Sequence, residues 1–180
     1  GEIVLINGIA DIGIGVTVTS VDSPAPLPML KVDEPTLTMN FCVNNSPLAG
    51  REGKFVTSRQ IWDRLQKELQ SNVALRVKET DADGIFEVSG RGELHLTILL
   101  ENMRREGYEL AVSKPRVVFH DVDGERHEPI ELVTADVEDT HQGAMMQALG
   151  ERRSELVNME TDGNGRVRLE YRIPARGLIG

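Results

Sequence analysis

The side chains best suited to do chemistry in this sequence are the arginines near its C-terminal end. Arg166, Arg168 and Arg172 share one parity in a segment whose alternate residues are apolar. In a β-strand, residues of equal parity lie on one face, so the three guanidinium groups are expected to point outward together. A guanidinium matches phosphate with a planar fork of donors, and structured RNA is recognised largely through its backbone and shape. The spacing predicts an RNA-binding face, with a merely solvated face as the alternative.

Other basic residues extend this set. Arg152 and Arg153 fall near the end of a predicted helix, where a favourable interaction with the helix dipole would also explain them. A second, weaker group belongs to the glycine-containing loop 46–58 and the residue after it, because exposed basic loops often carry contacts. The candidate RNA-contacting residues are Arg152, Arg153, Arg166, Arg168, Arg172 and Arg176, and in the second group Arg51, Lys54 and Arg59.

The elements that position the first group are predicted in residues 128–180. Apolar alternation predicts strands, helical spacing of Met145, Met146 and Leu149 predicts a helix, and the run Asp-Gly-Asn-Gly predicts a tight hairpin. The expected order is a strand over 130–137, a helix over 141–156, and strands over 156–160 and 166–173 joined by the turn 162–165. This is the first part of a β-α-β-β-α-β unit.

A complete unit of the same order is predicted over residues 35–115. Leu37, Met39, Phe41 and Val43 alternate with polar residues, as expected of a half-buried strand. Further strands are expected around residues 73–78, 86–88 and 108–112, and helices over 58–70, capped by Ser58, and from the glycine junction to about 106. The order β-α-β-β-α-β is the split ferredoxin-like pattern. A hinge is expected between the two units, at residues 114–116.

The first residues of the chain predict isolated strands and then a linker. Two β-rich runs, 2–6 and 15–21, are the expected strands, although two strands cannot bury a core alone. Prolines 24, 26 and 28 then predict a stiff linker. The fold class is therefore α+β, with two ferredoxin-like units, the second truncated, after remnant strands. The predicted domains are 1–28, 29–119 and 120–180.

Several kinds of chemistry are excluded by the sequence itself. No G-x-x-x-x-G-K-[ST] phosphate loop occurs. The four histidines include no pair at helical i, i+4 spacing, so no zinc site is predicted. The runs 81–84 and 121–124 lack the glycine and glutamate positions of a calcium loop and are predicted to be turns. No nucleophile, base and acid set can be assembled, so no catalytic residue and no metal is expected.

The composition limits the partners and the compartment. A net charge of −9 in 180 residues argues against a protein that coats nucleic acid indiscriminately, although it allows a local basic face. The chain has one cysteine, Cys42, which forms no disulfide within the chain and fits a reducing cytosol. A cytoplasmic, monomeric protein with no membrane partner is expected.

One octet carries more family information than any other stretch. Residues 89–96 read S-G-R-G-E-L-H-L, a strand that ends on glycines and turns into a helix. Gly90 and Gly92 are expected to allow unusual backbone angles and close approach, Glu93 to suit the positive end of the helix dipole, and His95 to pack or hydrogen-bond. The octet resembles the junction in the third domain of the translational GTPases, which include elongation factor G. Residues 101–119 resemble the helix and last strand of that domain.

Residues 34–59 and the tail 171–180 resemble the BipA/TypA branch in particular, so the resemblance covers the whole chain. It implies the end of a β-barrel second domain, a third domain and part of a fifth, in a fragment that lacks the GTPase domain. The parent would bind GTP and Mg²⁺ in the missing domain, dock in the ribosomal A-site region on rRNA and ribosomal proteins, and support ribosome assembly and stress adaptation. A ferredoxin-like regulatory module that binds a small ligand is the alternative reading.

Overall fold

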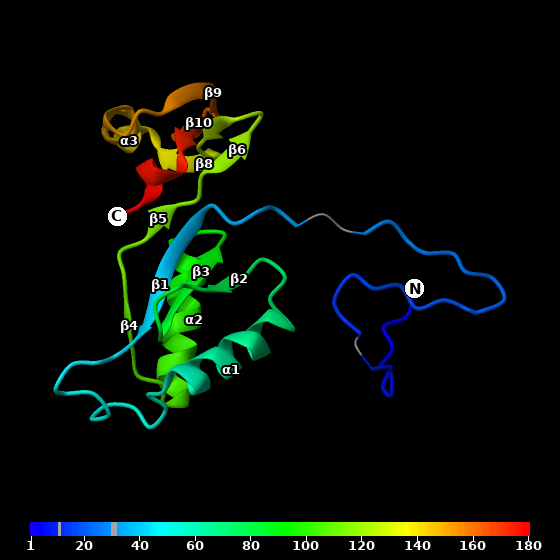
Figure 1. Cartoon of the computed structure of the whole chain (residues 1–180). Helices are drawn as coiled ribbons and strands as arrows, with labels where there is room; N and C mark the ends of the chain where they lie inside the picture. The colour runs from blue at the N-terminus through cyan, green and yellow to red at the C-terminus, as the bar shows by residue number, and fades with distance from the viewer. Residues whose placement is uncertain (11, 30–31) are drawn as a thin grey trace.

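The structure is a computed structural model that describes residues 1–10, 12–29 and 32–180. Two α+β units follow one another along the chain, and Figure 1 shows them joined by the connector that carries β5 (Arg116–Val117). In the described part of residues 1–36 there is no helix or strand. Among the described residues, no helix has the length and apolarity that crossing a membrane requires.

The expected strands at 2–6 and 15–21 are therefore wrong. Side chains such as Ile3, Leu5 and Val21 are almost fully exposed. A strand needs a neighbour for its backbone N–H and C=O groups and a layer to cover its apolar face, and no strand of the described residues pairs with either run. The assignment of residues 1–28 to a separate domain stays a prediction.

The first unit has the predicted ferredoxin-like order. It comprises β1 (Leu37–Val43), α1 (Ser58–Leu69), β2 (Arg76–Glu79), β3 (Ile85–Gly90), α2 (Glu93–Glu106) and β4 (Leu110–Val112). The strands form an antiparallel sheet in the order β2-β3-β1-β4. Both helices cover one face of this sheet (Figure 1). The strand expected around residues 73–78 begins only at Arg76, because a turn precedes it.

The core of the first unit lies between the sheet and the two helices, as the apolar spacing predicted. Phe41 and Val88 of the sheet pack against Ile61 and Leu65 of α1 and Met103 of α2, and all five are completely buried. The helix cap differs from the expectation. Thr57, not Ser58, is the N-cap of α1, and it exchanges side-chain and backbone hydrogen bonds with Gln60 in a capping box.

The second unit repeats the first four elements of the same order. Its elements are β8 (Ile130–Glu138), α3 (Asp139–Glu151), β9 (Glu155–Thr161), β10 (Arg166–Pro174) and the short 3₁₀ helix η1 (Ala175–Leu178). The sheet order is β8-β10-β9, with β10 in the centre. A small hairpin, β6 (His120–Val122) and β7 (Glu125–His127), precedes it. The turns at 162–165 and 121–124 are tight hairpin turns, as predicted.

Helix α3 is shorter than the predicted 141–156. It ends in a Schellman arrangement, in which the Ser154 N–H donates to the Leu149 carbonyl and the Arg153 N–H to the Gly150 carbonyl. Arg153 adopts the left-handed conformation, with φ of 61°, at the position that glycine usually takes. The chain then enters β9, so Leu156 is a strand residue.

The connector between the units is attached to the first sheet. β5 pairs with β1 along the same edge as β4, through Leu37–Val117 and Thr38–Arg116 partners. The Val118 N–H donates to the Thr36 carbonyl over 2.9 Å. The hinge predicted at residues 114–116 is therefore misplaced, because the residues that follow Pro115 still belong to the first sheet.

Candidate nucleic-acid interface

The arginines of β10 lie on the open face of the second sheet. Val167, Leu169 and Ile173 are buried in the cluster that includes Leu149 of α3. Arg166, Arg168 and Arg172 occupy the other parity of the strand and are exposed. The predicted outward presentation of the three guanidinium groups is confirmed.

The same face also carries carboxylates. Antiparallel register places Glu138 opposite Arg166, Asp136 and Glu160 opposite Arg168, and Glu155 opposite Arg172, and directly opposed residues lie on one face. Arg168 donates two hydrogen bonds to Asp136, of 2.8 and 2.9 Å, and these hold the pKa of that carboxyl below its ordinary value. The face is a pattern of alternating charge rather than a uniformly basic surface.

Two further candidates have partners within the chain. The Arg152 guanidinium donates to the Gly177 carbonyl over 2.7 Å and to the Gly180 carbonyl over 3.0 Å, so it ties the end of α3 to the C-terminal turn. Arg176 forms an ion pair of 3.1 Å with Glu128.

Three arginines of the first group keep their guanidinium groups available. Within the part of the chain that the structure describes, the side chains of Arg153, Arg166 and Arg172 have no ion pair or hydrogen bond. All three are exposed. They are the members of the group best placed to contact an external phosphate.

The basic loop of the first unit is held in place by one carboxylate, that of Glu109. Its oxygens accept hydrogen bonds from the backbone N–H groups of Gly50 (2.9 Å), Glu52 (3.0 Å) and Gly53 (3.1 Å). The Asn44 side-chain amide adds a fourth donor at 2.6 Å. These donors, the backbone N–H groups first, hold the pKa of the Glu109 carboxyl below its ordinary value.

Arg51, Lys54 and Arg59 are exposed on and after this loop. Arg59 lies 4.0 Å from Asp63 in a weak ion pair. In Figure 1 the loop that precedes α1 lies at the end of the first unit away from the second unit, so the two groups of cations do not form one surface.

The glycine junction positions α2 through close packing, not through unusual backbone angles. A Cβ on Gly90 would lie 2.8 Å from His95 Nδ1 and 2.9 Å from Leu96 Cδ2, so only glycine fits there. Gly92 is extended, with φ of 178°, and a Cβ there would meet no atom within 4 Å. The expectation that both glycines need angles closed to other residues is wrong, since neither has a positive φ in the left-handed region. Glu93 begins α2, as predicted.

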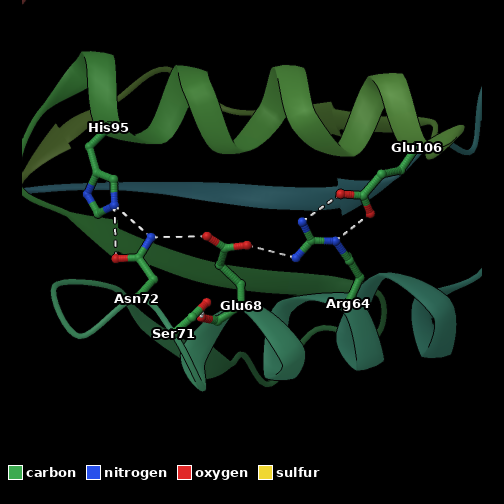
Figure 2. A network of polar contacts seen from close by, with 6 residues as sticks. All are labelled: Arg64, Glu68, Ser71, Asn72, His95 and Glu106. Atoms are coloured by element: carbon green, nitrogen blue, oxygen red, sulfur yellow. Dashed lines mark hydrogen bonds and ion pairs between the residues drawn. The ribbon is translucent and has the colours of Figure 1, made fainter. Parts of the chain in front are cut away.

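His95 starts a polar network between α1 and α2, which Figure 2 shows. Its Nδ1 accepts the Arg91 N–H over 3.2 Å, and its Nε2 faces the Asn72 side-chain amide, 2.9 Å from Nδ2 and 3.2 Å from Oδ1. The Asn72 amide then donates to Glu68 over 3.2 Å. The expected hydrogen-bonding role of His95 is what the structure gives it.

The network continues to the other end of α2. Arg64 donates to Glu68 over 2.9 Å and to both oxygens of Glu106 over 2.6 and 2.8 Å. The Glu106 hydrogen bond is the main reason why the pKa of Arg64 is raised, and Arg64 in turn lowers the pKa of Glu106. The two helices are thus joined by polar contacts at both ends of α2.

No cluster of three or more His, Cys, Asp or Glu side chains that could hold a metal ion occurs among the described residues. The network between α1 and α2 consists of hydrogen bonds and ion pairs among side chains of the chain itself. The geometry supports recognition of a charged surface by exposed guanidinium groups.

Comparison with known proteins identifies the family. All 180 residues align at 62% identity with "Large ribosomal subunit assembly factor BipA" of Escherichia coli strain K12. Haemophilus influenzae and Bacillus subtilis proteins of the same description align over the whole chain at 61% and 56% identity. The chain belongs to the BipA family. It spans 29–30% of the length of these relatives.

Two further similarities concern parts of this BipA-family chain. Residues 125–180 match the family described as "Elongation factor G C-terminus". A crystal structure of a protein from Thermus thermophilus aligns with 89% of this chain, over 39% of the length of that protein, at 12% identity and a TM-score of 0.45. The first similarity covers the second unit, in which β10 and its arginines lie.

Two positioning residues of the BipA-family chain escaped the sequence analysis. Glu109 accepts hydrogen bonds from loop N–H groups that lie 56–59 residues before it in the sequence, and no local pattern indicates such a contact. Arg64 was detectable in part, because Glu68 follows it at the i, i+4 spacing of helical ion pairs. Its stronger partner, Glu106, lies on another helix.

Proposed function

We propose that this chain is a ribosome-binding part of a large ribosomal subunit assembly factor of the BipA type. In the proposal, a further domain of the parent binds GTP with Mg²⁺ and hydrolyses it. The single observation that carries the proposal is the 62% identity, over every residue of the chain, to proteins described as large ribosomal subunit assembly factors. The factor would act as a monomer in the cytoplasm, on rRNA and ribosomal proteins, and in stress adaptation.

Arg153, Arg166 and Arg172 are proposed to contact rRNA phosphates. Their guanidinium groups are exposed and unpaired within the described residues, whereas Arg152, Arg168 and Arg176 are held by the chain itself. We also note that Arg153 occupies a left-handed backbone position, which costs about 1–2 kcal/mol for a side chain other than glycine. This backbone cost at Arg153 supports a role for its side chain.

The test is cosedimentation of the full-length protein with large ribosomal subunits at graded salt. Arg153, Arg166 and Arg172 are replaced together by glutamine, because glutamate at 166 or 172 would face Glu138 or Glu155 across the sheet. If each arginine contacts one phosphate, the slope of log affinity against log salt should fall by about 2–3. Unchanged affinity and slope would refute the assignment.

A matched control removes the same charge elsewhere. Lys67 on α1, Arg105 on α2 and Lys114 after β4 carry charges away from the β10 face, and their triple replacement by glutamine should leave the slope nearly unchanged. A similar loss in both triple variants would indicate a general effect of net charge and would refute a specific arginine face.

A further inference from the structure

The loop between β1 and α1 is docked, although it has no regular structure. Besides the hydrogen bonds to Glu109, the Lys54 and Phe55 N–H groups both donate to the Gly107 carbonyl, over 2.8 and 3.1 Å. The Glu109 N–H donates back to the Phe55 carbonyl, and the Phe55 and Tyr108 rings pack at 4.8 Å. Residues 50–55 are therefore attached to the turn between α2 and β4 by backbone, side-chain and aromatic contacts.

Close packing at Gly53 fixes the same geometry. A Cβ at this position would lie 2.6 Å from Glu109 Cβ and 2.8 Å from the Glu109 backbone nitrogen. A side chain there would push the loop away from Glu109. The loop sequence and the carboxylate are therefore matched to each other.

The charges of the loop are separated by this docking. Glu52 lines a hollow with Arg104 of α2, and the two charges interact. The carboxylate of Glu109 is surrounded by its four donors. Arg51 and Lys54 are exposed and have no ion pair among the described residues. The exposed charges of the loop, Arg51, Glu52 and Lys54, leave a net charge of +1 with Glu52 turned toward Arg104, in a chain whose net charge is −9.

Arg59 differs from these two cations. It lines a hollow with the acidic turn that contains Asp81 and Asp83, and it pairs weakly with Asp63. Its charge is offset by this surrounding, so the docked loop presents Arg51 and Lys54 as the two cations available to a partner.

We propose that Glu109 is a positioning residue that holds residues 50–55 as a rigid cationic hook, in which Arg51 and Lys54 bind the phosphate backbone of structured RNA. This inference rests on the proposed ribosome binding and adds a second contact, at the opposite end of the first unit from the β10 arginines. A phosphate backbone fits because two exposed cations on a rigid support match closely spaced charges without requiring base recognition.

The test uses Glu109→Gln in the full-length protein. Glutamine keeps the size of the side chain but replaces one acceptor oxygen with a donor amide that opposes the loop N–H groups. It also makes the protein less negative by one charge, which by general electrostatics should strengthen binding to RNA. The positioning role predicts the opposite sign, a loss of affinity for large ribosomal subunits of roughly tenfold, similar to the loss expected for Arg51→Ala with Lys54→Ala.

Two further variants separate the possible causes. Gly53→Ala displaces the loop without changing any charge, and it should weaken binding as Glu109→Gln does. Glu101→Gln removes an α2 carboxylate that pairs with Arg104 and Arg105, and with the same change of net charge it should not weaken binding. Hydrogen exchange of the Gly50, Glu52 and Gly53 amides reports the loop independently of the ribosome.

The outcomes are distinct. Faster exchange of the loop amides together with weaker, less salt-dependent binding supports the inference. Unchanged exchange in Glu109→Gln overturns the positioning role, and faster exchange with unchanged binding overturns the RNA contact. Weaker binding with an unchanged salt slope points to a protein partner and also overturns it. Absence of ribosome binding by the unaltered protein refutes the proposed function, while the exchange measurement still decides the role of Glu109.

Discussion

The polar network between α1 and α2 should contribute to stability, by an amount that depends on how exposed its side chains are. Arg64 is the centre of this network, with three hydrogen bonds to Glu68 and Glu106. Its side chain is only 11% exposed, whereas that of Glu106 is 45% exposed. Replacement of Arg64 by methionine keeps most of the apolar stem and removes the charge and all three donors.

The expected cost lies between those of buried and exposed contacts. A hydrogen bond to a charged group is worth about 1.5–3 kcal/mol, and an exposed ion pair about 0.2–1 kcal/mol. Water can replace the lost donor at Glu106 but reaches Glu68 poorly, because that side chain is 21% exposed. Arg64→Met should therefore lower the free energy of unfolding by about 2 kcal/mol.

Urea unfolding monitored by tryptophan fluorescence measures this loss of unfolding free energy in the first unit, where Arg64 lies. The one tryptophan, Trp62, packs against Phe86 in the first core, with ring centroids 5.3 Å apart. In a double-mutant cycle with Glu106→Gln, the coupling energy should be about 1 kcal/mol. The matched control Arg105→Met removes an exposed partner of Glu101 and should have a much smaller effect.

The dependence of the unfolding free energy on pH below neutrality provides a second measurement of the same contact. Arg64 lowers the pKa of Glu106 from its ordinary value of 4.5. A carboxyl with a lowered pKa in the folded state stabilises the fold fully above its ordinary pKa, and this stabilisation is lost as the pH falls through the lowered value. The loss below pH 4.5 should be smaller in Arg64→Met. A loss of under about 0.5 kcal/mol at neutral pH, or no coupling, would refute the network's role.

Three other outcomes are expected. Gly90→Ala should destabilise the first unit by about 1–3 kcal/mol in urea unfolding, because the new methyl would lie 2.8 Å from His95 Nδ1, whereas Gly92→Ala, with open space around its Cβ, should not. Equal effects of the two glycine substitutions would contradict the packing argument. Arg153→Gly should leave the fold as stable or make it more stable by up to about 1 kcal/mol and still weaken ribosome cosedimentation; a clear loss of thermal stability would argue against backbone strain at this residue. Hydrogen bonds lower the pKa of Glu109. Hydrogen exchange should therefore show that the loop amides stay protected below the ordinary carboxyl pKa and lose protection as the pH falls through the lowered value. Loss of this protection already at about pH 6 would be inconsistent with the role of the ionised carboxylate.

Regular alternation in the sequence was a reliable guide to the fold. The buried residues Val167, Leu169 and Ile173 of β10 follow period two, and the buried residues Ile61 and Leu65 of α1 follow the helical period. Such patterns arise because one face of each element is covered. The buried positions therefore recur at the period of the element and can be recognised from residues close together in the sequence. Both ferredoxin-like orders could be predicted on this basis.

Contacts between distant residues could not be predicted in the same way. The β10 arginines read as a basic row, but the carboxylates that face them belong to β8 and β9, and only the register brings them together. The strands expected at 2–6 and 15–21 have suitable composition and, among the described residues, no pairing strand. Composition gives a propensity, whereas pairing depends on what lies alongside.

The attachment of the connector determines where the second unit can pivot. Val118 is bonded to Thr36, and Thr36 is bonded in turn to the Gly90 carbonyl, through its N–H, and to the Arg91 carbonyl, through its hydroxyl. Rotation about Pro115 would break β5 away from β1, so a swing of the second unit must begin after Val118. A force on the second unit is therefore transmitted through β5 to β1 and to the glycine turn that precedes α2. The fixed point of such a rotation lies in the first sheet and not in the connector.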